Sequence, residues 1–277
     1  MNNIIVVEAS MSSYQQTFIH NYEIVYYSQK LASKTINEDG LAIFAIPRGV
    51  ALVVTDGVGG SHQSYRAVNQ VLNDLNNFFS NYDYENKDTV FSDDINKKLQ
   101  QINTKILNLD NPPQTTLSMA VIQSKKITVF QVGDSGTLLT GLKGKLKFMT
   151  PFQSIVGELL TANKITEKDA LVHPDLNIVN NVMGHEKCYV SNFLSEEVLK
   201  SNKTNKISKH DTLLLATDGL FDNYISQELI DIIRTGALKD IAELLRVSVS
   251  ENINIITKQK LLKQDDVSFI LCRRKSI

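Results

Sequence analysis

The stretch Val50-Ala51-Leu52-Val53-Val54-Thr55-Asp56-Gly57 is an apolar run that ends at a carboxylate beside a glycine. A buried strand of this kind places its terminal carboxylate at the rim of a sheet, where the small neighbour leaves the backbone free to bend. Two further runs end in the same way, Ile127 to Val132 before Gly133-Asp134 and Thr212 to Thr217 before Asp218-Gly219. Two more acidic strings lie just before apolar runs, Asn37-Glu38-Asp39 before Leu41 to Ile46 and Gln264-Asp265-Asp266 before Val267 to Cys272.

This recurrence indicates a metal site. If several such strand ends converge, their carboxylates form a cage of hard oxygen ligands. Clustered carboxylates repel one another unless a cation compensates them, and oxygen-rich octahedral sites suit magnesium or manganese better than zinc. The sequence therefore predicts metal-assisted chemistry.

The flanking segments alternate between strands and pairs of helices. Strands are expected at 23–27, 41–46, 50–55, 117–122, 127–132, 136–140, 146–149 and 267–272, with turn residues between them. One helix pair is predicted from apolar spacing between Val68 and Phe79 and between Ile95 and Leu109, and Pro112-Pro113 stops its second helix. A second pair follows Asp218, around residues 229–233 and 241–245. This order predicts a β-sandwich with helices covering both outer faces.

Length and composition fit one domain over residues 1–277. Residues 1–22 are expected to be an N-terminal extension or an edge strand. Residues 150–186 are mixed in polarity, carry a short predicted helix at Glu167 to Leu171, and look like a surface flap. The apolar fraction of 42% supports a sizeable core, and the net charge of -1 provides no field that would recruit nucleic acid or an anionic membrane.

The order of the motifs resembles the metal-dependent protein phosphatase family, type 2C, from about Glu23 to Arg273. The flap segment is similar to that of bacterial members. The resemblance implies an α+β fold of four αββα layers, with a central sandwich of two mostly antiparallel sheets flanked by helix pairs. The matching strings are Asn37-Glu38-Asp39, Val54 to Gly60, Thr115-Thr116-Leu117, Val132 to Gly136, Leu215 to Leu220 and Asp265 to Ser268.

The resemblance also implies roles at a centre of two divalent ions. Asp56 would bridge the ions, Asp218 and Asp265 would complete one, and the carbonyl of Gly57 would help to hold the other. Glu38 and Asp39 would act through bound water. Asp134 would help to bind a third metal near the flap, unless it serves only as a cap on the turn at Ser135-Gly136.

Four positions depart from the family pattern or leave alternatives open. Lys34 lies where relatives usually carry an arginine that holds the substrate phosphate, and a lysine offers a compact charge without the two-pronged donor. It is either a retained phosphate contact or a solvated lysine. Gln114 and Gly136 replace a common glycine and a common arginine. His62 is either a proton donor to the leaving oxygen or a histidine of a surface loop.

The function implied is hydrolysis of phosphoserine and phosphothreonine in proteins by a metal-activated water, with Mn²⁺ or Mg²⁺ as cofactor and no covalent phosphoenzyme. A catalytically weak or silent regulatory relative is the alternative, motivated by Lys34. A nucleotide-hydrolysing or cyclase-regulating metalloenzyme is a third hypothesis.

The expected partners are phosphorylated proteins, and the chain is expected to be a monomer. We also expect a signalling role in which the chain partners a bacterial serine/threonine kinase. The N-terminus lacks the pattern of a secretion signal, and no apolar stretch approaches the roughly 18 residues of a membrane span. Cys188 and Cys272 fit reduced thiols better than a disulfide framework. We therefore expect a cytoplasmic protein.

Overall fold

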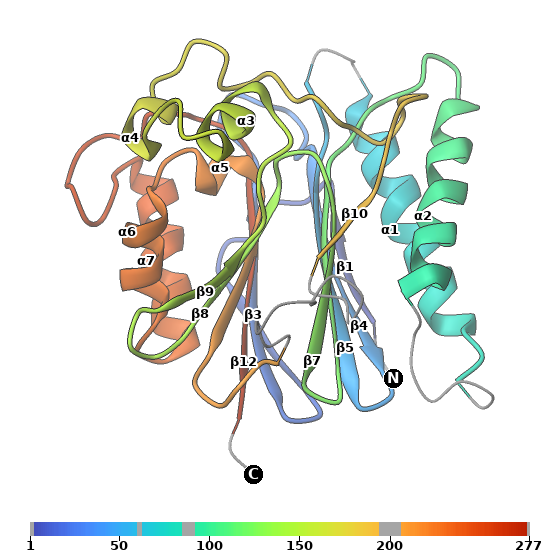
Figure 1. Cartoon of the computed structure of the whole chain (residues 1–277), viewed down its shortest axis with the longest axis horizontal. Helices are drawn as coiled ribbons and strands as arrows, with labels where there is room; N and C mark the ends of the chain where they lie inside the picture. Colours follow the sequence, from blue (N-terminus) through green and yellow to red (C-terminus); the bar gives the residue numbers. More distant parts are fainter. Residues whose placement is uncertain (1–2, 60–62, 85–91, 194–205, 276–277) are drawn as a thin grey trace.

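The computed structural model describes residues 3–59, 63–84, 92–193 and 206–275. Within these residues, two six-stranded sheets pack face to face, and every strand pairing is antiparallel (Figure 1). The first sheet has the order β1 (Ile4–Val7), β4 (Asp39–Ile46), β5 (Gly49–Asp56), β6 (Leu117–Gln123), β7 (Lys126–Val132) and β10 (Ser191–Phe193). The second has the order β2 (Gln15–Ile19), β3 (Tyr22–Gln29), β12 (Val267–Arg274), β11 (Thr212–Ala216), β8 (Gly136–Thr140) and β9 (Leu146–Met149).

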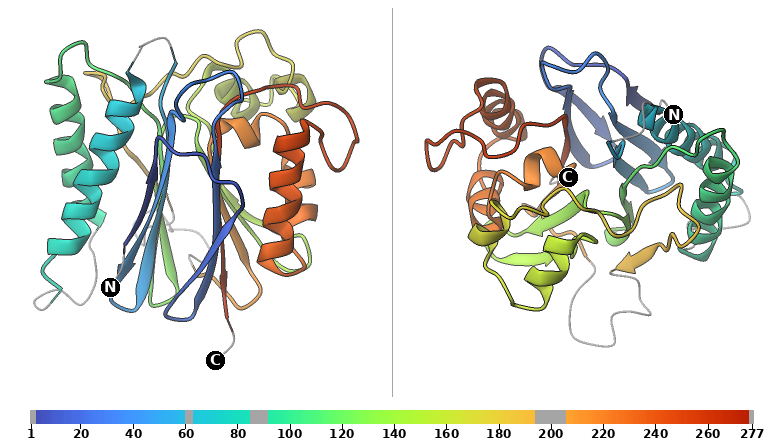
Figure 2. Two further views of the ribbon diagram at one scale, coloured as in Figure 1. Left: turned by 180° about the vertical axis from the view of Figure 1, so that it is seen from behind. Right: turned by 90° about the horizontal axis from the view of Figure 1, so that it is seen from above.

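Helices cover the outer face of each sheet. Helices α1 (Ser64–Asn81) and α2 (Ser92–Leu107) lie on the first sheet, and α6 (Ser226–Ile233) and α7 (Leu238–Glu251) lie on the second (Figures 1 and 2). The fold is therefore the predicted four-layer αββα arrangement. The first 22 residues contribute β1 and β2, which lie at one edge of each sheet.

The apolar runs that looked like buried strands are buried on both faces. Along β5, Leu52 and Val54 point into the layer between the sheets, while Ala51 and Val53 point toward α1 and α2. All four are fully buried. This explains why the run is continuously apolar and does not alternate with polar residues. Replacing a fully buried leucine here with alanine would cost about 2–5 kcal/mol.

The helix pair α1 and α2 follows the predicted spacing. Val68, Leu72 and Leu75 of α1 are buried at intervals of one helical turn, and Phe79 stacks on Phe44 of β4 with ring centroids 5.1 Å apart. Asp74 of α1 joins the two helices through ion pairs to two lysines of α2, Lys98 at 3.0 Å and Lys105 at 2.6 Å. The charged connection lies away from the strand ends that carry the predicted site.

Three short helices lie at the end of the sandwich where those strands terminate: α3 (Ile155–Thr161), α4 (Glu167–Ala170) and α5 (Asp218–Phe221) (Figure 2). Ser154 caps α3 by accepting a hydrogen bond from the Gly157 amide at 3.1 Å. Thr166 and Asp169 form a reciprocal capping box at the start of α4. The flap segment is thus built from two capped helices, of which the sequence predicted only α4.

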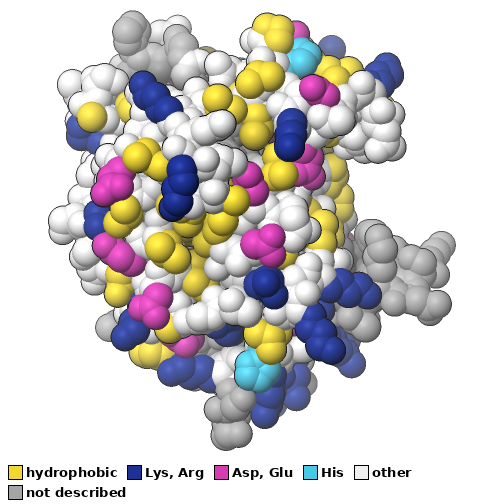
Figure 3. Space-filling model, turned by 90° about the vertical axis from the view of Figure 1, so that its left-hand side faces the viewer, with side chains coloured by type: hydrophobic (Ala, Val, Ile, Leu, Met, Phe, Trp, Pro, Cys, Tyr) yellow, Lys and Arg dark blue, Asp and Glu magenta, His cyan; other side chains and the backbone are white. Residues whose placement is uncertain are grey.

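The surface over α6 and α7 carries acidic, basic and apolar side chains interspersed in its described part (Figure 3). Exposed apolar side chains of this region include Leu244, Ile256 and Leu262. None of the helices in the described part of the chain combines the length and the hydropathy that a membrane span needs.

Candidate metal centre

The antiparallel topology brings the predicted aspartates to one end of the sandwich. Asp56 ends β5 and lies opposite Asp39, the first residue of β4. Asp134 follows β7, Asp218 follows β11, and Asp265 precedes β12. In antiparallel neighbours, the end of one strand lies beside the start of the next, so carboxylates at both kinds of terminus meet at one rim. We call these five residues the acidic cluster.

The centre of the acidic cluster is a triplet of carboxylates. Asp56, Asp134 and Asp218 each place one oxygen within 4.8 Å of the others. Burial raises the pKa of Asp56 well above its ordinary value, and the charges of Asp218, Asp39, Asp265 and Asp134 raise it further. All five members are thus close enough to interact electrostatically. Such a group is unfavourable as free anions and favourable around a cation.

Two buried oxygens of the cluster have no hydrogen-bond partner among the described residues. They are Oδ1 of Asp134 and Oδ1 of Asp39. Asp39 is 1% exposed, and its other oxygen accepts a hydrogen bond from the Thr217 hydroxyl at 2.8 Å. Burial raises the pKa of Asp39 and of Asp134, and neighbouring carboxylates add to the effect. A buried carboxylate oxygen without a donor is costly, and a bound cation removes that cost.

Glu38 and Gly57 lie beside the cluster at the start of α1. The Ser64 hydroxyl donates a hydrogen bond to the Glu38 carboxylate, and the Gly57 amide donates to the Glu38 carbonyl at 3.1 Å. A Cβ atom on Gly57 would lie 2.7 Å from Ser64 Oγ and 2.9 Å from the Glu38 carbonyl oxygen. Only glycine fits this close approach, which keeps the turn after Asp56 tight.

Lys34 is held by three carboxylates on one side of the cluster. Its ammonium lies 3.0 Å from Asp265, 3.1 Å from Glu38 and 3.3 Å from Asp266. Burial by itself would lower the pKa of Lys34, but the nearby carboxylates, Asp265 first, raise it above its ordinary value. The 31–38 segment is fastened to the start of β12, because the Leu31 and Glu38 amides each donate to Asp266 at 2.7 Å. Lys34 is therefore part of an ion-pair network and not a solvated side chain.

Sequence reasoning missed a second lysine at the centre. The Lys263 ammonium forms ion pairs with Asp218, with Asp222 at 2.9 Å and with Asp265 at 3.7 Å. The sequence could have indicated Asp222, because it lies four residues after Asp218 and hence on the same helical face. The indication for Lys263 is weaker, because it consists only of a position two residues before Asp265. Ser64 was missed as well.

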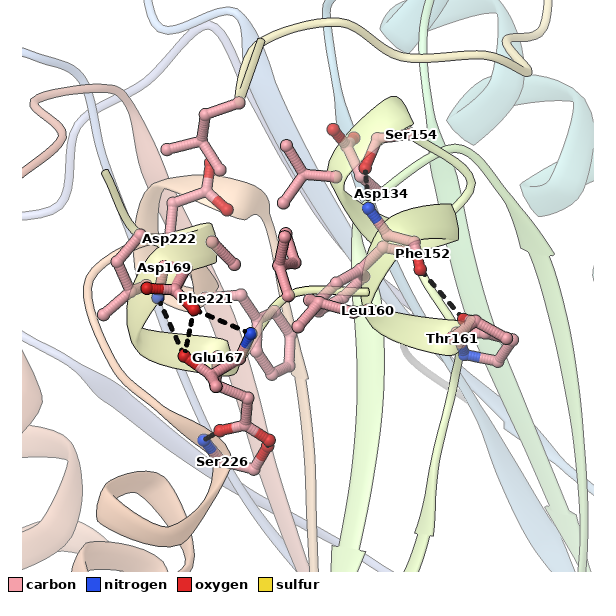
Figure 4. A pocket seen from close by; sticks show the side chains of 18 of the residues that line it. Asp134, Phe152, Ser154, Leu160, Thr161, Glu167, Asp169, Phe221, Asp222 and Ser226 are labelled. Atoms are coloured by element: carbon pink, nitrogen blue, oxygen red, sulfur yellow. Dashed lines mark hydrogen bonds between the residues drawn. The ribbon is translucent and has the colours of Figure 1, made fainter. Parts of the chain in front are cut away.

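A cavity of about 670 Å³ adjoins the centre beneath the flap. Asp134 and Asp222 line it together with apolar side chains from the flap and from α5, among them Phe152, Leu160 and Phe221 (Figure 4). The flap is tied to the α6 end of the cavity, because the Ser226 amide donates to the Glu167 carboxylate at 2.7 Å. The wall of this cavity thus joins the acidic cluster to an apolar surface.

The predicted residues fall into three groups. The structure brings Asp56, Asp134 and Asp218 into the central triplet, with Asp39, Glu38 and Gly57 beside it. Asp265 lies on the side of the two lysines and is not a member of the triplet. His62, the candidate proton donor, lies outside the described residues.

The chain as a whole is similar to known proteins. The family model for Protein phosphatase 2C matches residues 28–263, which is most of the chain. The chain belongs to the protein phosphatase 2C family. The match confirms the resemblance seen in the motifs, although it ends two residues before Asp265.

The chain is also similar to a phosphatase relative in sequence and to solved phosphatase structures in fold. The serine/threonine phosphatase stp of Listeria welshimeri is 28% identical over 253 residues, which cover 86% of this chain and 90% of that protein. The crystal structure of serine/threonine phosphatase Stp1 from Staphylococcus aureus has the same fold, with a TM-score of 0.75 and 21% identity over 98% of this chain and all of that one. The catalytic domain of PstP, solved in complex with two manganese ions, has a TM-score of 0.66 at 17% identity, over 92% of this chain and 99% of that one.

Proposed function

We propose that this chain hydrolyses phosphoserine and phosphothreonine monoesters in proteins with the help of divalent manganese or magnesium. The observation that carries the proposal is the acidic cluster, in which five buried or half-buried aspartates meet and two buried oxygens lack a hydrogen-bond partner among the described residues. Membership of the protein phosphatase 2C family and the names of its phosphatase relatives support the same activity.

The donor set fits magnesium or manganese. Its members are hard carboxylate oxygens, and nothing softer lies in the central triplet. Asp56, Asp218, Asp265 and the Gly57 carbonyl oxygen would hold a pair of these ions. Glu38 and Asp39 would act through water, and Asp134 would serve a third ion. Bound ions would lower the pKa of water toward neutrality and balance the charge that develops at phosphorus.

The surrounding residues of the chain would position the substrate. Lys34 supplies a positive charge beside the cluster, but its ammonium contacts Asp265, Glu38 and Asp266. It would reach a phosphate oxygen only by exchanging one of these carboxylates. The cavity beneath the flap begins at Asp134 and would accept the residues that flank the phosphorylated side chain. Protein selectivity would therefore depend on the flap, residues 150–186.

A catalytically silent relative is the second candidate. The observation that favours it is the pair of lysines, Lys34 and Lys263, which neutralise part of the cluster without a metal ion. Turnover of a phosphopeptide in manganese separates the two candidates. Tight manganese binding without hydrolysis would establish the silent form.

The test of the proposed function is release of phosphate from a phosphothreonine peptide. We expect turnover in manganese, loss of turnover in EDTA and recovery when manganese is restored. Asp218→Asn should lower kcat/KM by about a hundredfold or more, because it removes one ligand charge. Asp231→Asn, on the exposed face of α6, is the matched control and should leave turnover unchanged. Equal turnover by Asp218→Asn and the native chain would refute the assignment.

We further propose a single domain that acts as a cytoplasmic monomer on phosphorylated proteins in a signalling pathway. The thiols of Cys188 and Cys272 are free, which supports a reducing compartment.

A further inference from the structure

Lys263 lies where the proposed metal ligands converge. Its side chain is 12% exposed, and its ammonium contacts Asp218, Asp222 and Asp265. Two of these three carboxylates are assigned above to a divalent ion. The lysine ammonium therefore already neutralises carboxylates that such an ion would bind.

The main chain of Lys263 is fixed in this position by a buried amide. The Lys263 amide donates to Asn223 Oδ1 at 2.9 Å, and Asn223 Nδ2 donates to the Lys263 carbonyl at 2.9 Å. Asn223 is 3% exposed and follows Asp222, so the same segment that supplies two carboxylates also holds the lysine backbone. This two-point contact aims the side chain at the cluster, which distinguishes Lys263 from a surface lysine that meets an acid by chance.

The ammonium and a divalent ion would repel each other at Asp218. Like charges a few ångströms apart in a partly buried site interact strongly, because little water screens them. Asp222 can keep the ammonium bound when a divalent ion takes Asp218. It contacts the lysine at 2.9 Å and has no assigned role in holding the ions. The ammonium can stay with Asp222 while it gives up Asp218.

We propose that Lys263 is a tethered cation that holds the acidic cluster together in the metal-free protein and competes with the divalent ion for Asp218 and Asp265. It thereby sets the metal concentration at which the centre fills. The inference rests on the proposed metal-dependent function. Lys34 differs in that it lies on the other side of Asp265, contacts Glu38 and Asp266, and does not reach Asp218.

Manganese titration by calorimetry tests the proposal on the native chain and on Lys263→Met, which keeps an unbranched side chain one atom shorter and removes its charge. We expect the variant to bind manganese about tenfold more tightly or better, the lower end of the coupling measured for close charge pairs. In EDTA it should melt at a lower temperature than the native chain, and saturating manganese should narrow that gap.

Lys98→Met is the matched control, because it removes a lysine of similar burial from its ion pair with Asp74 in the α1–α2 layer. Its manganese affinity should equal that of the native chain. Equal or weaker manganese binding by Lys263→Met would overturn the tethered-cation proposal alone. No manganese binding by either the native chain or Lys263→Met would overturn the metal centre and, with it, the role of Lys263.

A measurement on the native chain covers the case in which Lys263→Met does not fold. In protein labelled with ¹⁵N, the ammonium resonance of Lys263 and the backbone amide of Asp218 are followed during addition of magnesium, which is diamagnetic. We expect both signals to move together as the ion displaces the ammonium. A moving Asp218 amide with a constant Lys263 ammonium would contradict the proposal, and a constant Asp218 amide would contradict the metal centre.

Discussion

At the scale of single residues, two lysines neutralise part of the negative charge of the acidic cluster. The Lys34 ammonium forms ion pairs with Asp265, Glu38 and Asp266, which lie 3.0–3.3 Å away. An arginine has five donors in a planar fork, so it can keep carboxylate contacts and still present two donors to a phosphate. The lysine therefore limits how well the chain holds a substrate phosphate.

Lys34→Arg tests this limit. We expect kcat/KM for a phosphothreonine peptide to rise by about tenfold, mainly through a lower KM, because a bidentate contact is the stronger phosphate contact. Initial-rate kinetics at saturating manganese measure the effect, with Lys98→Arg as the control for the substitution type. An unchanged KM in Lys34→Arg would show that this position does not reach the substrate.

The buried carboxylates predict how metal-free stability depends on pH. Burial raises the pKa of Asp222 from 3.8 to about 7, even though Lys263 opposes the shift. Between these two values the folded state binds more protons than the unfolded state, so stability falls as the pH rises. In EDTA, the melting temperature of the native chain relative to Asp222→Asn should therefore be highest near pH 4 and should decrease toward pH 8. A difference that stays constant or grows with pH would contradict this account.

At the scale of elements, the site depends on close packing between α5 and the start of β12. Asp218-Gly219 opens α5, and the carbonyl of Asp266 lies directly against Gly219. A Cβ atom on Gly219 would lie 2.1 Å from that carbonyl oxygen. This contact positions Asp218 relative to Asp265, so the two proposed ligands share one backbone constraint.

Gly219→Ala should disturb stability and metal binding together. We expect a loss of about 1–3 kcal/mol in the free energy of unfolding, typical of overpacking, and weaker manganese binding because Asp218 moves away from Asp265. Thermal melts and manganese calorimetry measure the two effects. Gly59→Ala is the control, since a Cβ atom there meets nothing within 4 Å among the described residues. Normal manganese affinity in a destabilised Gly219→Ala would show that the contact is only structural.

At the scale of the whole molecule, the sequence predicted the layers because their pattern is strong. Runs such as Val50 to Thr55 are apolar on both faces, which is the signature of a strand buried between a second sheet and a helix layer. The same runs locate the acidic cluster, because antiparallel pairing places their ends together. Lys263 could not be predicted in the same way, since its position depends on the loop path that Asn223 fixes.

The sequence also could not predict several of the shortest helices and strands. Helices α3 and α5 and strand β10 (Ser191–Phe193) have three to seven residues, too few to show a hydrophobic period. Their form depends on local caps and on contacts with the sandwich. For Asp134, the resemblance implied a third-metal role near the flap, whereas its place beside Asp56 and Asp218 in the central triplet depends on how the two sheets pack.

The central claim is that folding gathers distant carboxylates into one site for paired divalent ions. Anomalous diffraction at the manganese edge, from crystals soaked in manganese, tests it most directly. We predict two peaks bridged by Asp56, with Asp218 and Asp265 at coordination distance from one of them. Diffraction from fully soaked crystals without a peak among these three aspartates would contradict the account.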